Sequence, residues 1–270
     1  MEIVKHTINE FMDEASIVII SDLHIGHRSH LKEQFEKAID EIAIMNPELV
    51  IVNGDLIDGI TIKDKRFTPK AMHPDFADFD NIDDIIIRQC DVAIEYLEQL
   101  QRLGIKVYVL EGNHEESIRK YTSVFSPYNY ICNKLETQKI GYYGYFDIAF
   151  GNQRYGIVAQ HGSGGGGTTA GYPANKVSKL AQTFDCDLYT IGHIHRSSVN
   201  DVEKYKYNVE TNERERVRTW LGTTGCFLDT SSIGADDYFA RQATSLSDIG
   251  YLVFNVKRDS HESTLYERKL

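Results

Sequence analysis

Five short segments of the sequence carry the side chains with the clearest chemical potential, and each comes directly after a run of apolar residues. They supply His, Asp and Asn, which are ligands suited to Mn, Fe or Zn. The segments are Asp22-Leu23-His24, Gly54-Asp55-Leu56-Ile57-Asp58, Gly112-Asn113-His114-Glu115, His161-Gly162 and Gly192-His193-Ile194-His195. Residues i and i+2 of an extended backbone point the same way, so the outer residues of D-x-H and H-x-H are expected to face one pocket. The pattern predicts a metal centre.

The first half of the chain alternates between short apolar runs and longer amphipathic stretches. Residues 17–20, 49–52 and 107–110 predict buried strands, and residues 31–45 and 82–100 carry apolar side chains at helical spacing. This alternation is typical of parallel β-α-β units. In open α/β sheets the functional crevice lies beyond the C-terminal ends of the strands, where the first three segments stand.

The second half predicts further strands, with the histidine segments again at strand ends. Strands are predicted at residues 142–150, 155–160, 188–191, 251–256 and 264–268, a helix at 176–184, and a hairpin from 202–209 and 213–221. No internal repeat or interdomain linker is visible, so we expect a single domain over residues 1–270.

Composition indicates a globular protein, with 41% apolar and 26% charged residues. The net charge of -11 argues mildly against a dedicated nucleic-acid binder. Nucleic acid stays open as a substrate, because bound divalent cations would return positive charge to the site. The four dispersed cysteines predict reduced, mostly buried thiols in a cytoplasmic protein. Neither a signal peptide nor a membrane-spanning run is predicted.

In their order, and over roughly residues 17 to 197, the five segments resemble the calcineurin-like metallophosphoesterases. Solvated strand-end turns are the alternative, because Asn and Asp also favour turns. The resemblance implies an α/β fold, a four-layer αββα sandwich with two central mixed β-sheets. It also implies two divalent metal ions, Mn, Fe or Zn, with these ligands: Asp22, His24 and His195 for one ion, Asn113, His161 and His193 for the other, and Asp55 bridging both.

Hydrolysis of a phosphate ester is the reaction that the resemblance implies, by a hydroxide that bridges the two metal ions. Two such ions can polarise phosphoryl oxygens and generate hydroxide near neutral pH. His114 would lie beside them and protonate the leaving group as general acid, the alternative being a purely structural histidine. Asp58 matches the carboxylate that orients this histidine in the phosphoprotein phosphatase branch.

Three functions compete. We prefer hydrolysis of a phosphodiester in a nucleic acid, a nucleotide or a small diester. The alternative is a phosphomonoesterase, including a protein phosphatase. In that phosphatase branch an arginine clamps the monoester where this chain has Gly59, whereas Glu115 favours the branch, and Arg119 or Lys176 could supply the clamp instead. A non-catalytic scaffold for a protein partner ranks last, because every ligand is retained.

Several features near the five segments have open roles. A glycine-rich loop at residues 162–169 either gates the substrate or is a flexible loop that needs unusual dihedrals. Residues 59–80 read as a second, long loop. His27 either approaches the substrate or is a solvated loop residue. The sequence indicates no oligomeric state.

Overall fold

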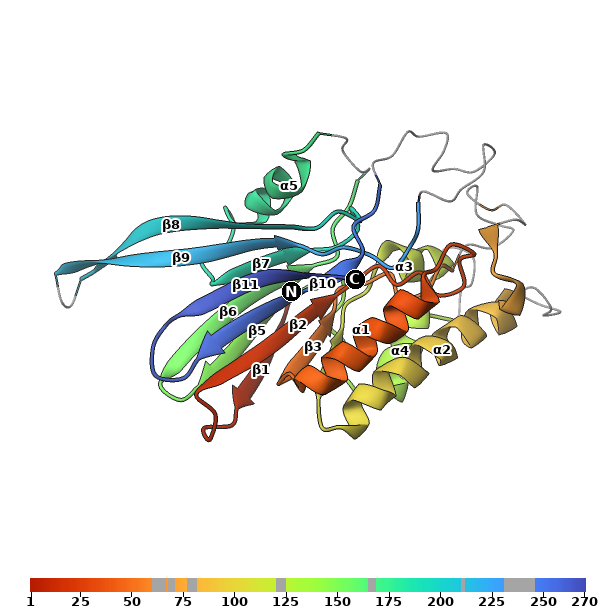
Figure 1. The fold of residues 1–270 in the computed structure, drawn as a ribbon, viewed down its shortest axis with the longest axis horizontal. Coiled ribbons are helices and arrows are strands. Elements are labelled where there is room, and N and C mark those ends of the chain that lie inside the picture. Colours follow the sequence, from red (N-terminus) through yellow and green to blue (C-terminus); the bar gives the residue numbers. More distant parts are fainter. Residues whose placement is uncertain are drawn as a thin grey trace.

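The computed structural model describes residues 1–59, 67, 71–76, 82–119, 125–164, 169–209, 212–230 and 246–270. Its framework is a pair of β-sheets that pack face to face, with helices on both outer sides (Figure 1). One sheet has five strands and the other has six, and each contains both parallel and antiparallel neighbours. The predicted sandwich with two central mixed sheets is confirmed.

The strands and helices have the following bounds. The five-stranded sheet runs, in spatial order, through β11 (Ser263–Lys269), β10 (Gly250–Lys257), β2 (Glu14–Ile20), β3 (Leu49–Val52) and β4 (Lys106–Val109). The six-stranded sheet runs through β1 (Glu2–Ile8), β5 (Tyr143–Phe150), β6 (Gln153–Gln160), β7 (Leu188–Ile191), β9 (Glu213–Thr223) and β8 (Ser198–Asn208). The helices are α1 (Lys32–Met45), the 3-10 helix η2 (Pro74–Phe76), α2 (Ile82–Arg102), α3 (Asn113–Arg119), α4 (Pro127–Lys134) and α5 (Tyr172–Leu180).

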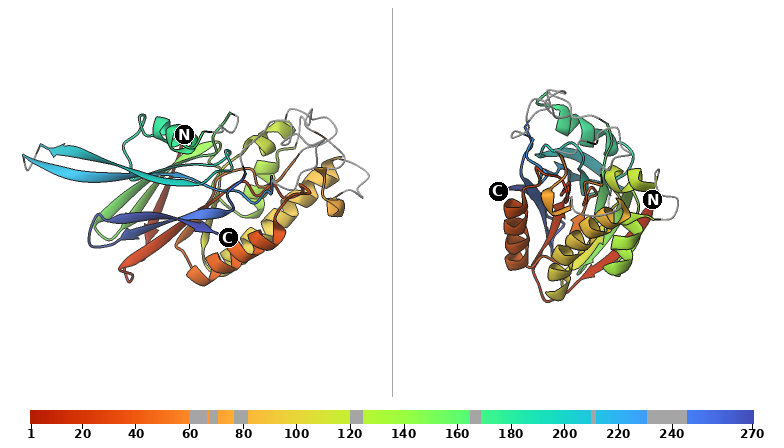
Figure 2. Two further views of the ribbon diagram at one scale, coloured as in Figure 1. Left: turned by 45° about the horizontal axis from the view of Figure 1, so that its top comes forward. Right: turned by 90° about the vertical axis from the view of Figure 1, so that its right-hand side faces the viewer.

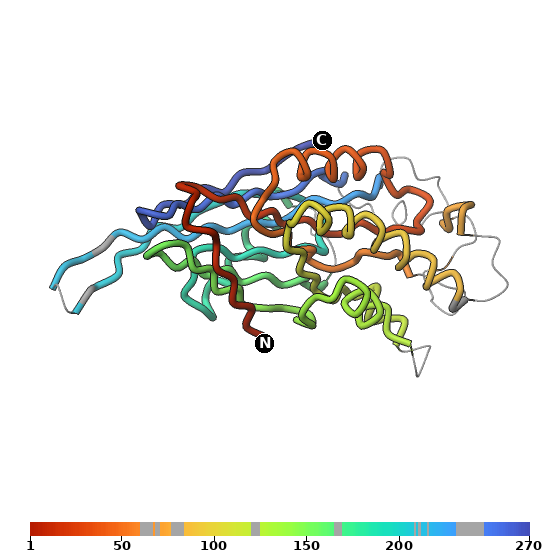
Figure 3. The backbone as a smooth tube through the Cα atoms, turned by 90° about the horizontal axis from the view of Figure 1, so that it is seen from below, coloured from red at the N-terminus to blue at the C-terminus, as the bar shows by residue number. Residues whose placement is uncertain are grey.

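Three apolar clusters hold the four layers together. Val18 of β2 faces the cluster under α1, α2 and α4, whereas its neighbour Ile19 faces the cluster between the two sheets. A strand buried on both faces reads as a continuous apolar run rather than an alternating one, as β2 does. The third cluster joins Val177 of α5 to Tyr189 of β7 on the outer face of the six-stranded sheet. Figure 3 shows α1, α2 and α4 side by side over the five-stranded sheet.

The long hairpin of β8 and β9 projects well beyond the other strands (Figure 2). The predicted hairpin is therefore confirmed, and its strands are longer than expected. Tyr205 and Tyr207 are exposed on this arm. Among the described residues, β8 and β9 contact α5 and β11, and β9 also pairs with β7.

Four elements were not predicted, namely β1, α3, α4 and the 3-10 helix η2, and α5 is displaced from its predicted bounds. β1 was not predicted because only two of its seven residues, Val4 and Ile8, are buried, and α3 begins inside a predicted ligand segment. α4 has a readable start, since Ser126 accepts a hydrogen bond from the Asn129 N–H at 3.2 Å and Pro127 occupies the first helical position. The helix predicted at residues 176–184, with Pro173 as its expected introduction, spans Tyr172–Leu180: the proline lies in its first turn, and the helix ends earlier than predicted.

Several predictions concern single features. The four cysteines are free and buried, as predicted. Most of the predicted long loop at residues 59–80, and residues 165–168 of the glycine-rich loop, lie outside the described residues. None of the helices in the described part of the chain has the length and apolar composition that a membrane crossing requires. The single domain over residues 1–270 stays a prediction.

Candidate metal centre

The five predicted segments leave the C-terminal ends of five strands, β2, β3 and β4 in one sheet and β6 and β7 in the other. Hydrogen bonds join them where they meet. The Asp22 N–H donates to the Gly54 carbonyl at 3.1 Å within one sheet. Between the sheets, the Asn53 side-chain amide donates to the Gln160 carbonyl at 3.0 Å. Residues far apart in sequence are therefore brought to one end of the sandwich.

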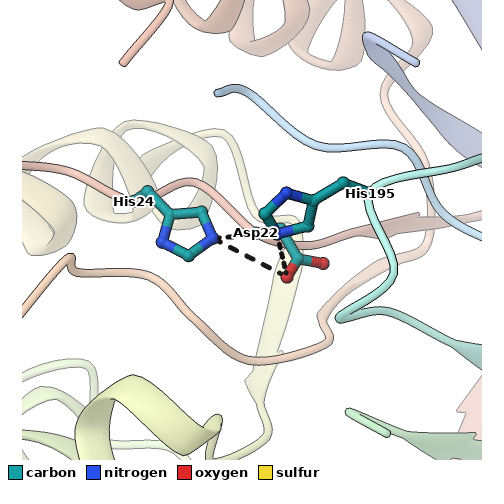
Figure 4. Close-up of side chains that lie close together, drawn as sticks. All are labelled: Asp22, His24 and His195. Atoms are coloured by element: carbon teal, nitrogen blue, oxygen red, sulfur yellow. Dashed lines mark hydrogen bonds and ion pairs between the residues drawn. The ribbon is translucent and has the colours of Figure 1, made fainter. Parts of the chain in front are cut away.

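The first donor group consists of Asp22, His24 and His195 (Figure 4). Nε2 of His195 lies 3.3 Å from Asp22 Oδ1 and 3.1 Å from Nε2 of His24. The other carboxylate oxygen, Oδ2, accepts hydrogen bonds from the Ser21 hydroxyl and, at 2.8 Å, from the His193 N–H. Oδ1 is buried and has no hydrogen-bond donor in the described structure. One oxygen thus fixes the carboxylate while the other faces two imidazoles.

The second donor group consists of Asp55, His161 and His193, with Asn113 beside it. Nδ1 of His161 donates to the Asn53 carbonyl at 2.7 Å, so Nε2 is the nitrogen without a proton in the neutral ring. That Nε2 lies 3.2 Å from Asp55 Oδ2 and 3.1 Å from Asn113 Oδ1. Three donors of different chemistry therefore converge around one point.

His114 lies between the two groups and is buried. Its ring centroid is 4.6 Å from that of His24, and its Nε2 lies 3.9 Å from Asp55 Oδ2. Nδ1 forms a short hydrogen bond with the Asp58 backbone carbonyl. The Asp58 carboxylate lies 3.9 Å from the same Nδ1 and also 3.9 Å from Nδ1 of His24. Asp58 thus contacts His114 most closely through its backbone.

The backbone at the predicted ligands is left-handed, which corrects one step of the sequence argument. The positions concerned, all with φ between 50° and 67°, are Asp22, His24, Asp55, His193 and His195. The expectation that D-x-H and H-x-H point one way because the chain is extended is therefore wrong. Non-glycine residues rarely adopt this region, and such strain clusters at functional sites. The alternative of ordinary solvated turns does not fit residues that are mostly buried.

The electrostatics of the centre keep its carboxylates ionised. Burial alone raises the pKa of Asp55, but His161 and His114 outweigh burial and hold that pKa well below its usual range. Burial lowers the pKa of His24, as does His114. For His161, burial lowers the pKa, but the Asp55 carboxylate outweighs it and raises the pKa to about 9. The ionised form of these carboxylates is the one that metal ligation requires.

These residues fit divalent cations. Each of the two donor groups offers three ligand atoms within 4.8 Å of one another. The buried Asp22 Oδ1 without a donor, and two imidazole nitrogens that face each other at 3.1 Å, are arrangements that a cation between them would satisfy. A further group of His24, Asp58 and His114 lies within the same distance, although Nδ1 of His114 is already bonded to the Asp58 carbonyl.

Glu115 is a buried residue beside the candidate site whose contacts the sequence did not reveal. Its fully buried carboxylate accepts hydrogen bonds from the backbone N–H groups of Asp55, Leu56, Ile57 and Gly112, at 2.7 to 3.2 Å. It therefore ties the segment after β3 to the segment after β4. Burial and the nearby Asp55 charge raise the pKa of Glu115 to about 7. Its position in G-N-H-E was the only signal in the sequence.

His27 also differs from one of the two sequence interpretations. It is buried, and its Nδ1 accepts a hydrogen bond from the Ser29 N–H at 3.0 Å. The interpretation as a solvated loop residue is therefore wrong. The approach of His27 to a substrate stays a prediction.

Known proteins define the class to which this fold and site belong. The family model described as calcineurin-like phosphoesterase matches residues 15–197, so the chain belongs to that family. No curated protein matches the chain.

Several solved structures match most of the chain at low identity. YfcE, a phosphoesterase from E. coli, is 11% identical, with 93% of this chain and 98% of that chain covered and a TM-score of 0.43. The nuclease MPE of Pseudomonas putida is 12% identical, with 93% and 87% covered and a TM-score of 0.34. A single mutant of Vps29 from Entamoeba histolytica is 13% identical, with 94% and 99% covered and a TM-score of 0.37.

Proposed function

We propose that this protein is a two-metal hydrolase that cleaves phosphodiesters. The observation that supports the proposal most directly is the pair of donor groups, each with one carboxylate and two imidazoles. In this proposal one ion is held by Asp22, His24 and His195, the other by Asn113, His161 and His193, and Asp55 is shared. Two divalent ions, when bound, polarise phosphoryl oxygens and make water a better nucleophile.

His114 is proposed as the general acid of this reaction. Its Nδ1 is held by the Asp58 carbonyl, so the ring cannot turn without losing that hydrogen bond. Nε2 then faces the side of Asp55, where the reacting ester would lie. A proton on Nε2 can be passed to the departing oxygen, a contribution of about 10²–10⁴ in rate for a positioned acid. Asp58 is proposed as the residue that sets the orientation of His114.

Preference for a diester rests on the surroundings of the two cations that could clamp a monoester. The Arg119 guanidinium pairs with the Glu111 carboxylate at 2.9 Å. The Lys176 ammonium donates to the Ser163 carbonyl. Gly59 stands where the phosphoprotein phosphatase branch has its arginine. A dianionic monoester gains most from such a bidentate clamp, so these contacts favour the singly charged diester.

The experiment compares diester and monoester hydrolysis by metal-loaded protein. Purified protein is analysed for metal content and supplied with Mn²⁺ or Zn²⁺, and turnover is measured on bis-nitrophenyl phosphate, nitrophenyl phosphate and a dinucleotide. We expect two ions per chain and faster hydrolysis of the diesters. Faster hydrolysis of the monoester would assign a phosphomonoesterase instead. Absence of turnover despite bound metal would favour a binding role.

His114→Ala tests the acid separately. The alkoxide that leaves a dinucleotide needs a proton, whereas nitrophenolate leaves without one. We therefore expect turnover of the dinucleotide to fall about 10²–10⁴-fold, turnover of bis-nitrophenyl phosphate to fall much less, and both metal ions to be retained. Equal losses on the two substrates would reject the acid assignment.

A further inference from the structure

The start of the glycine-rich loop contacts one of the proposed ligands. Nε2 of His193 lies 2.8 Å from the Gly164 carbonyl oxygen. A carbonyl only accepts, so this ring nitrogen carries the proton and donates. A neutral imidazole has a single N–H, which leaves Nδ1 as the nitrogen able to bind a cation. Gly164 thus determines which tautomer of His193 is present.

The backbone of the loop is shaped for this close approach. Gly162 and Gly164 have φ of +101° and +91°, a region that favours glycine. A Cβ at Gly162 would lie 3.4 Å from the Cβ of His193. The Gly192 N–H, one residue before His193, donates to the His161 carbonyl at 3.1 Å. The segments that carry His161 and His193 therefore contact each other and the start of the glycine-rich loop.

Lys176 connects this loop to helix α5. Its ammonium donates to the Ser163 carbonyl, next to Gly164, and a Cβ on Gly164 would lie 3.3 Å from Nζ. The following residue, Val177, is fully buried against the outer face of the six-stranded sheet, so the helix is anchored. A glycine residue loses more conformational freedom than any other residue when its backbone is held in one conformation. Lys176 holds Ser163, the residue before the Gly164 carbonyl that orients His193.

We propose that Lys176 is a positioning residue of the metal centre, which acts through the Ser163–Gly164 segment to fix the ring of His193. The inference rests on the proposed function, since it takes His193 as a metal ligand. It assigns a role to the described start of the glycine-rich loop and to α5. This positioning role differs from that of a phosphate clamp, because a clamp would contact the substrate and leave the metal affinity unchanged.

The test measures metal affinity rather than activity alone. Lys176→Met removes the donor and keeps the length of the side chain, Lys176→Arg keeps a donor, and Lys179→Met is the matched control on the exposed side of the same helix. Dissociation constants of Mn²⁺ are measured by competition with a chromogenic chelator. Partners that orient metal ligands contribute about 10–100-fold in affinity. We expect Lys176→Met to bind one of two ions about tenfold more weakly, the low end of that range, because Lys176 acts through one intervening segment.

The other outcomes of this experiment distinguish the positioning role of Lys176 from a substrate clamp and from a purely structural role. Lys176→Arg should restore the affinity, and Lys179→Met should match the original protein. Equal or tighter binding by Lys176→Met would overturn the inference, because removal of a positive charge alone strengthens cation binding. A raised KM with unchanged metal affinities would assign a substrate clamp. A matching loss of unfolding free energy in the metal-free variant would reduce Lys176 to a structural role. Failure of the unmodified protein to bind two ions would reject the proposed function itself.

Discussion

The left-handed backbone at His24 predicts that glycine is more stabilising than alanine at this position, the opposite of the order at an ordinary residue. His24 has φ of 50°. This conformation costs alanine about 1–2 kcal/mol, and glycine adopts it freely. The greater freedom of glycine in the unfolded chain offsets about 0.4–1 kcal/mol of that difference. In metal-free protein, His24→Gly is therefore expected to be more stable than His24→Ala by about 0.5–1 kcal/mol.

Urea unfolding in the presence of a chelator measures this difference, because both variants lack the imidazole and neither can bind the full set of ions. Ala43→Gly in α1 is the control with the opposite sign, since glycine inside a helix is about 1 kcal/mol less stable than alanine. If His24→Ala proved as stable as His24→Gly while Ala43→Gly lost stability as expected, the strain at His24 would be refuted. The same reasoning would then fail at the other left-handed ligands.

Three further predictions concern residues that hold the centre. Glu115→Gln should lower the unfolding free energy by about 1–3 kcal/mol in urea titrations and should weaken metal binding. The reason is that the NH₂ group of glutamine cannot accept hydrogen bonds from the backbone N–H groups that now donate to the carboxylate. An unchanged unfolding midpoint would refute this prediction. Gly112→Ala should cost about 3 kcal/mol, because its Cβ would lie 2.1 Å from Asp55 Oδ1, whereas Gly171→Ala meets only an atom at 3.7 Å and should be nearly neutral. Burial lowers the pKa of His30 from 6.5 to about 4, so the unfolded chain binds a proton at a higher pH than the folded protein does. The contribution of His30 to the unfolding free energy is therefore complete above pH 6.5 and falls towards pH 4, by at most about 3 kcal/mol. His30→Asn should flatten this pH dependence in urea titrations, and an unaltered slope would reject the prediction.

The parts of the fold that could be predicted are those that local patterns determine. β3 and β7 match their predicted bounds because each is a run of four buried residues, all apolar in β3 and interrupted only by Thr190 in β7. β1 could not be found in this way, since it lies at the edge of a sheet and buries only Val4 and Ile8, with His6 between them on the same face. The bounds of α5 differ from the predicted 176–184 because the helix already includes Pro173 in its first turn and ends at Leu180.

For the candidate site, the sequence predicted which residues come together but not the backbone conformation that holds them. Spacing identified the residues that the structure brings together, but the stated reason, an extended D-x-H, was wrong. The left-handed turn at Asp22 is held by partners that no local pattern could indicate. Its carboxylate accepts from the His193 N–H, 171 residues away, and its carbonyl accepts from the Phe227 N–H at 2.9 Å. Because these partners come from the other sheet and from beyond β9, the conformation of the ligand depends on the completed sandwich. The metal centre is therefore expected to form only after the two sheets have packed, and its ligands cannot be pre-arranged in the isolated N-terminal β-α-β unit.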